Sequence, residues 1–299
     1  MSLKSLSELV DQAKTKGPKR LVACAAEDDA VIKAVSLAVN EKIIEPIFVG
    51  NGDKIKEIAK QINCDISSIE IIEESNPAQA AKIAVKLIND GKADILMKGL
   101  IGTADFLRAV LDKENGLRKG KLLSHIGLFE CPSYHKLLGI TDAAQNVCPS
   151  LEDKVTILKN SIEVYHKLGI ENPKIAAVCA IEGVNPKMPA TTDAAALAMM
   201  NQRKQIKGCT LDGPLALDNA ISAEAAKHKG IESEVAGDVD LLLTHDIEMG
   251  NVLYKAMSYL AGGSCASVLL GARVPVVLTS RADSDKSKLQ SIALATNLA

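Results

Sequence analysis

Aromatic side chains are nearly absent from this chain. There is no tryptophan among 299 residues, and phenylalanine and tyrosine occur only three and four times. Because 47% of the residues are hydrophobic, the core must be aliphatic, and such compositions favour parallel α/β layers. The net charge is −2, without a dominant basic run or an aromatic platform, so nucleic acid is not an expected partner.

Motifs for metals, redox chemistry and nucleotides are also missing. The seven cysteines form no C-x-x-C pair, which is typical of reduced, buried residues in a cytoplasmic protein. The five histidines show no ligand spacing and the aspartates form no D-x-D pair at one strand end, so we expect no metal. Without a G-x-x-x-x-G-K-[ST] loop or a G-x-G-x-x-G fingerprint, ATP hydrolysis and Rossmann-type NAD binding lose support.

No membrane segment is expected. Residues 1–17 carry charges every few positions, unlike a signal peptide or a membrane span. Cytoplasmic localisation without membrane contact is therefore the default expectation.

The chain alternates short apolar runs with helical patterns. Strands are expected at 21–26, 44–50, 69–72 and 93–99, and helices at 28–42, 53–62, 77–90 and from Thr103. Residues 113–149 interrupt this rhythm with two strands around a proline-containing turn, and they are the candidate domain junction. A second alternating series follows: helices at 151–168, 191–203, 216–229 and 249–261, strands at 174–181, 208–212 and 239–246, two apolar runs at 265–278 and an amphipathic helix at 283–297. The prediction is two α/β lobes with largely parallel sheets, with ligands at strand ends or between the lobes.

Polar residues recur where the expected strands end. Each has an ordinary alternative in turns or helix caps, but their recurrence favours a binding cleft. The candidate substrate-binding residues are Lys98, Gly99, Thr103, Asn185, Thr191, Asp212, Asp218, Asn219, Asn251 and Lys255.

The last apolar run ends in a hydroxyl and a guanidinium. Ser280 and Arg281 stand just before the final helix, where its N-terminus would help to hold a phosphoryl or carbonyl oxygen. The alternative is a capping serine beside a solvated arginine. Lys98, Lys255 and Arg281 together form a candidate anion clamp. His245-Asp246 is a tempting pair, but a strand-end histidine followed by a helix-capping aspartate is the simpler interpretation.

Long stretches of the sequence resemble the phosphate acetyl/butyryltransferase family. Within that family, they most resemble the butyryltransferase branch. The resemblance covers essentially the whole chain and is densest over 175–299. It is carried by ADILMKG (93–99), VNPKMPATTDAAAL (184–197), DGPLALDNAIS (212–222), DVDLLLTHDIEMGNVLYKAM (238–257), LLGARVPVVLTSRADS (269–284) and KLQSIALA (288–295).

The resemblance implies reversible transfer of a short acyl group between coenzyme A and inorganic phosphate, giving an acyl phosphate and free coenzyme A. Acyl-coenzyme A and phosphate would be the substrates, with no tightly bound cofactor. The implied fold is two α/β lobes around an interdomain cleft, like the isocitrate and isopropylmalate dehydrogenases. Residues 1–141 plus 281–299 would form the first domain, and 142–280 the second.

The family's Ser-Arg site motif falls on Ser280 and Arg281. The acetyl branch's thiol-deprotonating aspartate falls on Ser287, which leaves Asp283 and Asp285 as neighbouring candidates and Asp212 as a rival. The arginine before the acetyl enzymes' Lys-Gly motif is replaced by apolar residues 95–97, which is compatible with a longer acyl group.

Other functions stay open at this point. A dehydrogenase of the same architecture would need metal and nicotinamide motifs that are missing here. A non-catalytic anion or acyl-coenzyme A sensor would keep a basic cleft but need no base, and the loops could instead serve oligomer contacts. We expect a homodimer or a higher homo-oligomer, because closed symmetric dimers are the commonest assemblies.

Overall fold

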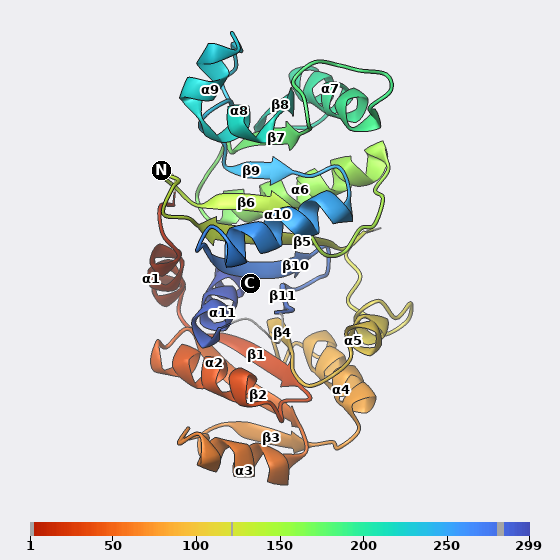
Figure 1. Cartoon of the computed structure of the whole chain (residues 1–299). Coiled ribbons are helices and arrows are strands. Elements are labelled where there is room, and N and C mark those ends of the chain that lie inside the picture. Colours follow the sequence, from red (N-terminus) through yellow and green to blue (C-terminus); the bar gives the residue numbers. More distant parts are fainter. Residues whose placement is uncertain (1–2, 121, 280–283) are drawn as a thin grey trace. The chain divides into compact units, whose positions relative to one another are not determined.

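The computed structural model describes residues 3–120, 122–279 and 284–299. These divide into two compact units (Figure 1). The N-terminal unit consists of Leu6–Lys121 with Ala266–Ala299, and the central unit of Met1–Ser5 with Leu122–Cys265. The limit at Lys121/Leu122 falls inside the expected junction, 113–149. The domain boundaries at 141/142 and 280/281 stay a prediction.

The N-terminal unit contains a mostly parallel set of strands in the order β3-β2-β1-β4-β11-β10. All neighbours are parallel except β10, which runs antiparallel to β11. The strands are β1 (Lys19–Cys24), β2 (Ile44–Gly50), β3 (Glu70–Glu73), β4 (Ile95–Lys98), β10 (Ser264–Leu270, whose first two residues belong to the central unit) and β11 (Val276–Val277).

Helices alternate along the chain with most strands of the N-terminal unit. They are α1 (Leu6–Lys16), α2 (Asp29–Asn40), α3 (Gly52–Gln61), α4 (Pro77–Asn89), α5 (Thr103–Val110) and α11 (Asp285–Leu298). Their starts follow local chemistry: Asp28 and Asn51 accept amide hydrogen bonds as N-caps, and Asn76 caps α4 just before Pro77.

Helix α11 packs against α1 and α2. It was expected to be amphipathic, but it is buried on nearly every side, including Gln290, Thr296 and Asn297. The Asn297 amide donates to the carbonyl oxygen of Leu9 at 2.8 Å, and Lys16 donates to the carbonyl oxygen of Asn297 at 2.8 Å. Partners far away in the sequence therefore satisfy the side-chain NH₂ and the backbone carbonyl of Asn297, a residue that the helical pattern assigns to solvent.

The central unit carries strands in the order β5-β6-β9-β7-β8. Strands β6, β9, β7 and β8 are parallel, and β5 is antiparallel to β6. The strands are β5 (Ser124–Glu130), β6 (Leu138–Thr141), β7 (Lys174–Val178), β8 (Thr210–Leu215) and β9 (Leu241–Leu243); the helices are α6 (Leu151–Lys167), α7 (Pro189–Gln202), α8 (Leu217–Ile221), α9 (Ala223–His228) and α10 (Ile247–Tyr259).

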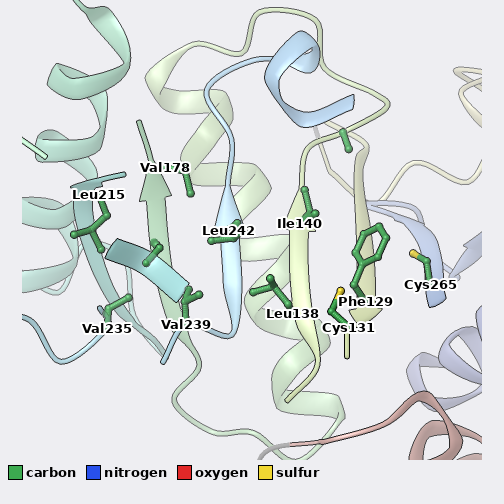
Figure 2. Close-up of a cluster of buried hydrophobic side chains, with 13 residues drawn as sticks. Phe129, Cys131, Leu138, Ile140, Val178, Leu215, Val235, Val239, Leu242 and Cys265 are labelled. Carbon is green, nitrogen blue, oxygen red and sulfur yellow. The ribbon is translucent and has the colours of Figure 1, made fainter. Parts of the chain in front are cut away.

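The core of the central unit is mainly aliphatic, as the composition predicts. Figure 2 shows Leu138 and Ile140 of β6 beside Leu242 of β9 and Phe129 of β5. Burial of such side chains contributes about 25 cal/mol per Å² of apolar surface.

One expected helix is two helices. The pattern over 216–229 predicts a single helix, but Ser222 adopts an extended conformation between α8 and α9. Its side chain accepts a hydrogen bond from the Ala225 amide and so caps α9. Serine favours such caps over helix interiors because its hydroxyl competes for backbone groups.

An ion-pair network lies where β6, β7 and β9 begin. The Asp238 carboxylate contacts Lys174 at 2.7 Å, His135 at 2.8 Å and Lys136 at 3.0 Å. The buried Lys136 also pairs with Asp240 at 2.7 Å. Burial alone would raise the pKa of Asp238, but the hydrogen bonds from Lys174, His135 and Lys136 outweigh it and hold that pKa well below its ordinary value.

Candidate functional site

The carboxyl ends of β1, β4 and β11 meet at one edge of the N-terminal unit. Lys98 is the last residue of β4 and pairs in register with Cys24 of β1. Gly99 follows, and a Cβ built there would lie 2.2 Å from the carbonyl oxygen of Ala25. Only glycine allows this approach, in which the Gly99 amide donates to the carbonyl oxygen of Cys24 at 2.9 Å.

Lys98 and Thr103 lie on either side of this tight turn. The Lys98 ammonium donates to the carbonyl oxygen of Gly99 at 3.2 Å. Thr103 is exposed in the first turn of α5, whose N-cap Gly102 supplies no side-chain acceptor. A lysine and a hydroxyl beside a helix N-terminus suit an anion. The three predicted residues Lys98, Gly99 and Thr103 thus come together in one segment.

Strand β11 leads toward the same edge. It is parallel to β4, with Val276 opposite Leu96 and Val277 opposite Met97. Ser280, Arg281 and Asp283 lie outside the described residues, so their positions stay a prediction. Asp285 is the first residue of α11, just after the N-cap Ser284, whose hydroxyl accepts from the Ser287 amide.

In the central unit, Asn185 and Thr191 hold a loop. The buried Thr191 hydroxyl accepts from the Asn185 amide at 2.9 Å and donates to the carbonyl oxygen of Met188 at 2.8 Å. The Asn185 side chain accepts from the Lys187 amide. Both residues therefore shape the entrance to α7, and their predicted role in substrate binding stays a prediction.

The three polar candidates of the DGPLALDNA segment (212–220) differ from one another in how far they are buried. Asp212 is half-buried in a groove of about 420 Å³ between α7 and β8, and its carboxylate accepts from the Gly213 amide at 2.7 Å. Asp218 is exposed in the first turn of α8. Asn219 is fully buried, and neither polar atom of its side chain has a hydrogen-bond partner among the described residues.

Asn251 and Lys255 sit on α10 with different surroundings. The Asn251 amide donates to the carbonyl oxygen of Ala143 at 3.1 Å, next to the end of β6. Lys255, one helical turn later, is exposed. Residues four apart on a helix are neighbours on its surface, so Asn251 and Lys255 lie close together along α10, and their role in substrate binding stays a prediction.

Asp142 is a hub that sequence reasoning missed. It is buried directly after β6 and accepts hydrogen bonds from the amides of His125 at 3.2 Å and of Ala144 and Gln145 at 3.0 Å. The Asn146 side chain also donates to it. The turn after Asp142 is visible in the sequence, but its partner His125 is brought in by the antiparallel β5–β6 pairing.

A second missed cluster joins Lys154, Asp193 and His245. The Lys154 ammonium is buried 2.7 Å from the Asp193 carboxylate, and His245 Nδ1 lies 3.9 Å from the same oxygen. Burial lowers the pKa of His245, Lys154 lowers it further, and Asp193 opposes both. These three residues line a cavity of about 10 Å³, enough for about one water. Asp246 caps α10, as the simpler interpretation of the His-Asp pair predicts.

The described residues hold no cluster of potential metal ligands, and most of the cysteines are buried. No group of three or more His, Cys, Asp or Glu side chains there could hold a metal ion. All seven cysteines are unpaired, and burial raises the pKa of Cys24 to about 12 and of Cys179 and Cys209 to about 11. Such thiols are poor nucleophiles at neutral pH. Within the same residues, no helix is both long and apolar enough to span a bilayer.

Solved structures resemble the chain over nearly its whole length. A branched-chain phosphotransacylase from Enterococcus faecalis matches with a TM-score of 0.84 and 32% identity, over 94% of this chain and 98% of that one. A 4-hydroxythreonine-4-phosphate dehydrogenase from Klebsiella pneumoniae matches with a TM-score of 0.54 at 13% identity, over 94% and 99% of the two chains, which shows the fold alone. The expected α/β fold of the isocitrate dehydrogenase type is confirmed.

Sequence relatives agree with the structural match. The chain is 49% identical over 297 residues to a phosphate butyryltransferase of Clostridium acetobutylicum, covering 99% of both chains. It is 47% identical over 289 residues to a phosphate acetyltransferase of Thermotoga maritima, covering 97% of this chain and 98% of that one. Residues 5–82 and 73–296 match the family described as Phosphate acetyl/butaryl transferase. The chain therefore belongs to the phosphate acetyl/butyryltransferase family and is a phosphate acyltransferase.

Proposed function

We propose that this protein moves a butyryl or similarly short acyl group between coenzyme A and inorganic phosphate, producing an acyl phosphate and free coenzyme A. The observation that carries the proposal is the 49% identity to a phosphate butyryltransferase over 99% of both chains. Coenzyme A is a substrate here, no tightly bound cofactor is required, and the reaction takes place in the cytoplasm.

The proposed chemistry is direct transfer in a ternary complex. In the direction of acyl-coenzyme A formation, the coenzyme A thiolate attacks the carbonyl carbon of the acyl phosphate, the carbon–sulfur bond forms, and the bond to the phosphate oxygen breaks. The formation of acyl phosphate is the reverse of this step. Negative charge develops on the carbonyl oxygen and on the departing phosphate. Arg281 and Ser280 stabilise that charge, and a preorganised donor of this kind contributes about 3–4 kcal/mol. Lys98, beside the tight turn at Gly99, adds a cation for phosphate.

A base is needed because a free thiol has a pKa of about 8.5 and is mostly protonated at neutral pH. Ser287, which stands where the acetyl branch has its aspartate, is committed to the start of α11: its amide and hydroxyl both contact Ser284 Oγ, at 3.1 Å. A serine is also no base by itself. We therefore propose Asp283, Asp285 or Asp212 as the group that accepts the thiol proton.

Acetyl transfer is the second candidate, supported by the 47% identity to the phosphate acetyltransferase of Thermotoga maritima. The apolar residues Ile95, Leu96 and Met97, expected to favour a longer acyl group, are fully buried in β4. They can therefore influence which acyl-chain length the protein prefers only indirectly, through their packing behind the site. Two additional buried methylenes are worth about 1.6 kcal/mol, or roughly 15-fold in kcat/KM.

The test is an initial-velocity study of thiol release from acetyl- to hexanoyl-coenzyme A in the presence of phosphate. The proposal expects turnover that is fastest with butyryl-coenzyme A, and intersecting velocity patterns because both substrates are bound before transfer. Preference for acetyl-coenzyme A would favour the second candidate. Binding without thiol release would identify a sensor and overturn the proposal.

A further inference from the structure

Three ionisable side chains from different elements meet in the central unit. Lys154 belongs to α6, Asp193 belongs to α7, and His245 stands two residues after the end of β9. We call these three residues the α7 clamp. The Lys154 ammonium donates to the Asp193 carboxylate at 2.7 Å and to the carbonyl oxygen of Pro149 at 3.0 Å. Because the Lys154 side chain is only 3% exposed, its charge depends on that carboxylate.

His245 completes the α7 clamp without a direct hydrogen bond. Its Nδ1 is buried, has no hydrogen-bond partner among the described residues, and lies 3.9 Å from the Asp193 carboxylate. A polar contact of this length is commonly bridged by water, and the cavity that the three residues line has room for about one. The clamp is therefore fixed at Lys154 and adjustable at His245.

The α7 clamp holds the start of α7 and the loop before it. Asp193 stands two residues after Thr191, whose hydroxyl accepts from the Asn185 amide at 2.9 Å. Asn185 belongs to the loop of residues 179–188, which joins β7 to α7. A movement of Asp193 would therefore be passed through Thr191 to this loop.

The 179–188 loop lies where open α/β sheets bind their ligands. Strands β7 and β9 are parallel neighbours, but the helices that follow them pack on opposite faces. Leu243 of β9 lines the cavity beside α7. Leu242, the residue before it, belongs to the cluster against which α10 packs (Figure 2). Ligands in such sheets bind at the carboxyl ends of a strand pair of this kind. His245 and the 179–188 loop follow these two ends.

We propose that the α7 clamp is a positioning device for substrate binding: with a neutral His245 ring, it holds the 179–188 loop in the conformation that binds acyl-coenzyme A. Ile181 and Val184 are exposed on this loop and suit the apolar part of that substrate better than they suit inorganic phosphate. This inference rests on the proposed acyl transfer. The clamp residues act through the loop and touch no reacting atom.

Acid should loosen the α7 clamp. Burial lowers the pKa of His245, and Lys154 lowers it further, whereas Asp193 and Asp246 oppose both effects. The ring is therefore neutral at neutral pH. Cys179, whose thiol also senses Lys154 and Asp193, stays protonated because burial raises its pKa to about 11. A protonated ring would place a second cation beside Lys154, with the Asp193 carboxylate shared between them.

Hydrogen exchange tests the clamp independently of catalysis. His245→Leu has a similar volume but lacks both nitrogens, so we expect the amides of residues 180–192 to exchange at least about fivefold faster than in wild type. His245→Asn places an amide near the position of Nδ1 and should keep exchange within about twofold of wild type. The control is His166→Asn, because His166 contacts the carbonyl oxygen of Gly208 at 2.8 Å from the other end of α6. Equal exchange in His245→Leu and wild type would overturn the clamp.

Calorimetric titration with butyryl-coenzyme A, without phosphate, tests the link to substrate. At neutral pH, His245→Leu should raise the dissociation constant at least about tenfold, and His245→Asn should stay within about threefold of wild type. From neutral pH to about pH 5, the ratio of the wild-type dissociation constant to that of His245→Asn should rise at least about threefold, because only the wild-type ring gains a proton. Taking this ratio cancels every titration that the two proteins share, and unfolding curves check that both are folded.

The outcomes separate the clamp from the proposed function. Faster exchange in His245→Leu without weaker binding, or a ratio that stays constant with pH, would overturn the role of the clamp in substrate binding. A wild type that neither binds nor turns over any acyl-coenzyme A would contradict the proposed function and that role with it. The exchange experiment would still decide whether the three residues hold the 179–188 loop.

Discussion

Several single residues near the strand ends have a structural role, either because they allow a close backbone approach or because they form hydrogen bonds within a loop. Gly99 was predicted from its place after a strand, and its close approach to Ala25 explains why no larger residue fits. Thr191 was predicted for the same reason, yet its hydroxyl closes a loop. Asp142 was not predicted, although it gathers more hydrogen bonds than either. The sequence reveals polar residues at strand ends, but their partners depend on the register of neighbouring strands.

The buried Asp142 should be sensitive to loss of its charge. Asp142→Asn keeps one oxygen for the Ala144 and Gln145 amides, but its NH₂ group would face the donors of His125 and Asn146. We expect a loss of about 1–3 kcal/mol in the free energy of unfolding, measured by denaturant titration. Asp246→Asn is the matched control, since asparagine caps a helix as well as aspartate does. Equal effects of the two variants would argue against the hub.

Arg281 should act on turnover rather than on stability. If it stabilises the transition state as proposed, Arg281→Ala should lower kcat by about 10²–10³. Arg281→Lys should recover only part of the rate, because a point charge cannot reproduce the planar guanidinium fork. Steady-state kinetics with an unfolding control checks this. A variant that keeps more than about half of the wild-type kcat would contradict the assigned role.

At the scale of elements, the alternation of strands and helices can be predicted from the sequence, because it follows from the spacing of apolar residues and from helix-capping residues. Ser150 and Asp153, for example, form a capping box at the start of α6, where the sequence predicts a helix over 151–168. The break at Ser222 and the burial of α11 were not foreseen, because both depend on neighbours distant in the chain. The same limit hid the Lys154–Asp193 pair, whose members come from α6 and α7.

The candidate bases are Asp285 at the first position of α11, Asp212 within β8, where the sequence pattern had ended the strand, and Asp283, which lies outside the described residues. Changing Asp283, Asp285 and Asp212 one at a time to asparagine should identify one variant with at least a tenfold lower kcat. In that variant the acidic limb of the pH profile of kcat/KM should flatten, because the group that titrates there is gone. Wild-type rates and profiles in all three variants would exclude these aspartates and leave thiolate formation to a cation such as Lys98 or to solvent.

At the scale of the whole molecule, the fold class and the family could be predicted from the sequence, because long motifs spread over the chain indicate both. The ion-pair network around Asp238 could not be predicted from the sequence, because His135, Lys174 and Asp238 meet only when β6, β7 and β9 align.

This network makes the free energy of unfolding depend on pH. Because the pKa of Asp238 is lowered on folding, its stabilisation is present above the unfolded value of about 3.9 and is lost as the pH falls below it.

Asp238→Asn should therefore lower the free energy of unfolding at neutral pH and have a shrinking effect in acid. Chemical denaturation from neutral pH to strongly acidic pH measures the difference between variant and wild type. Because Asp238 is partly exposed, high salt should reduce the neutral-pH difference. A difference that stays constant across the pH range would mean that the network does not titrate with folding.

Acyl transfer from coenzyme A to phosphate is tested most directly by counting both products. Purified protein is mixed with butyryl-coenzyme A and inorganic phosphate, and free coenzyme A and butyryl phosphate are quantified in the same samples. We expect the two to appear in equal amounts, at a rate that depends on phosphate and saturates with it. Coenzyme A release that is independent of phosphate, or no release at all, would contradict the assigned reaction.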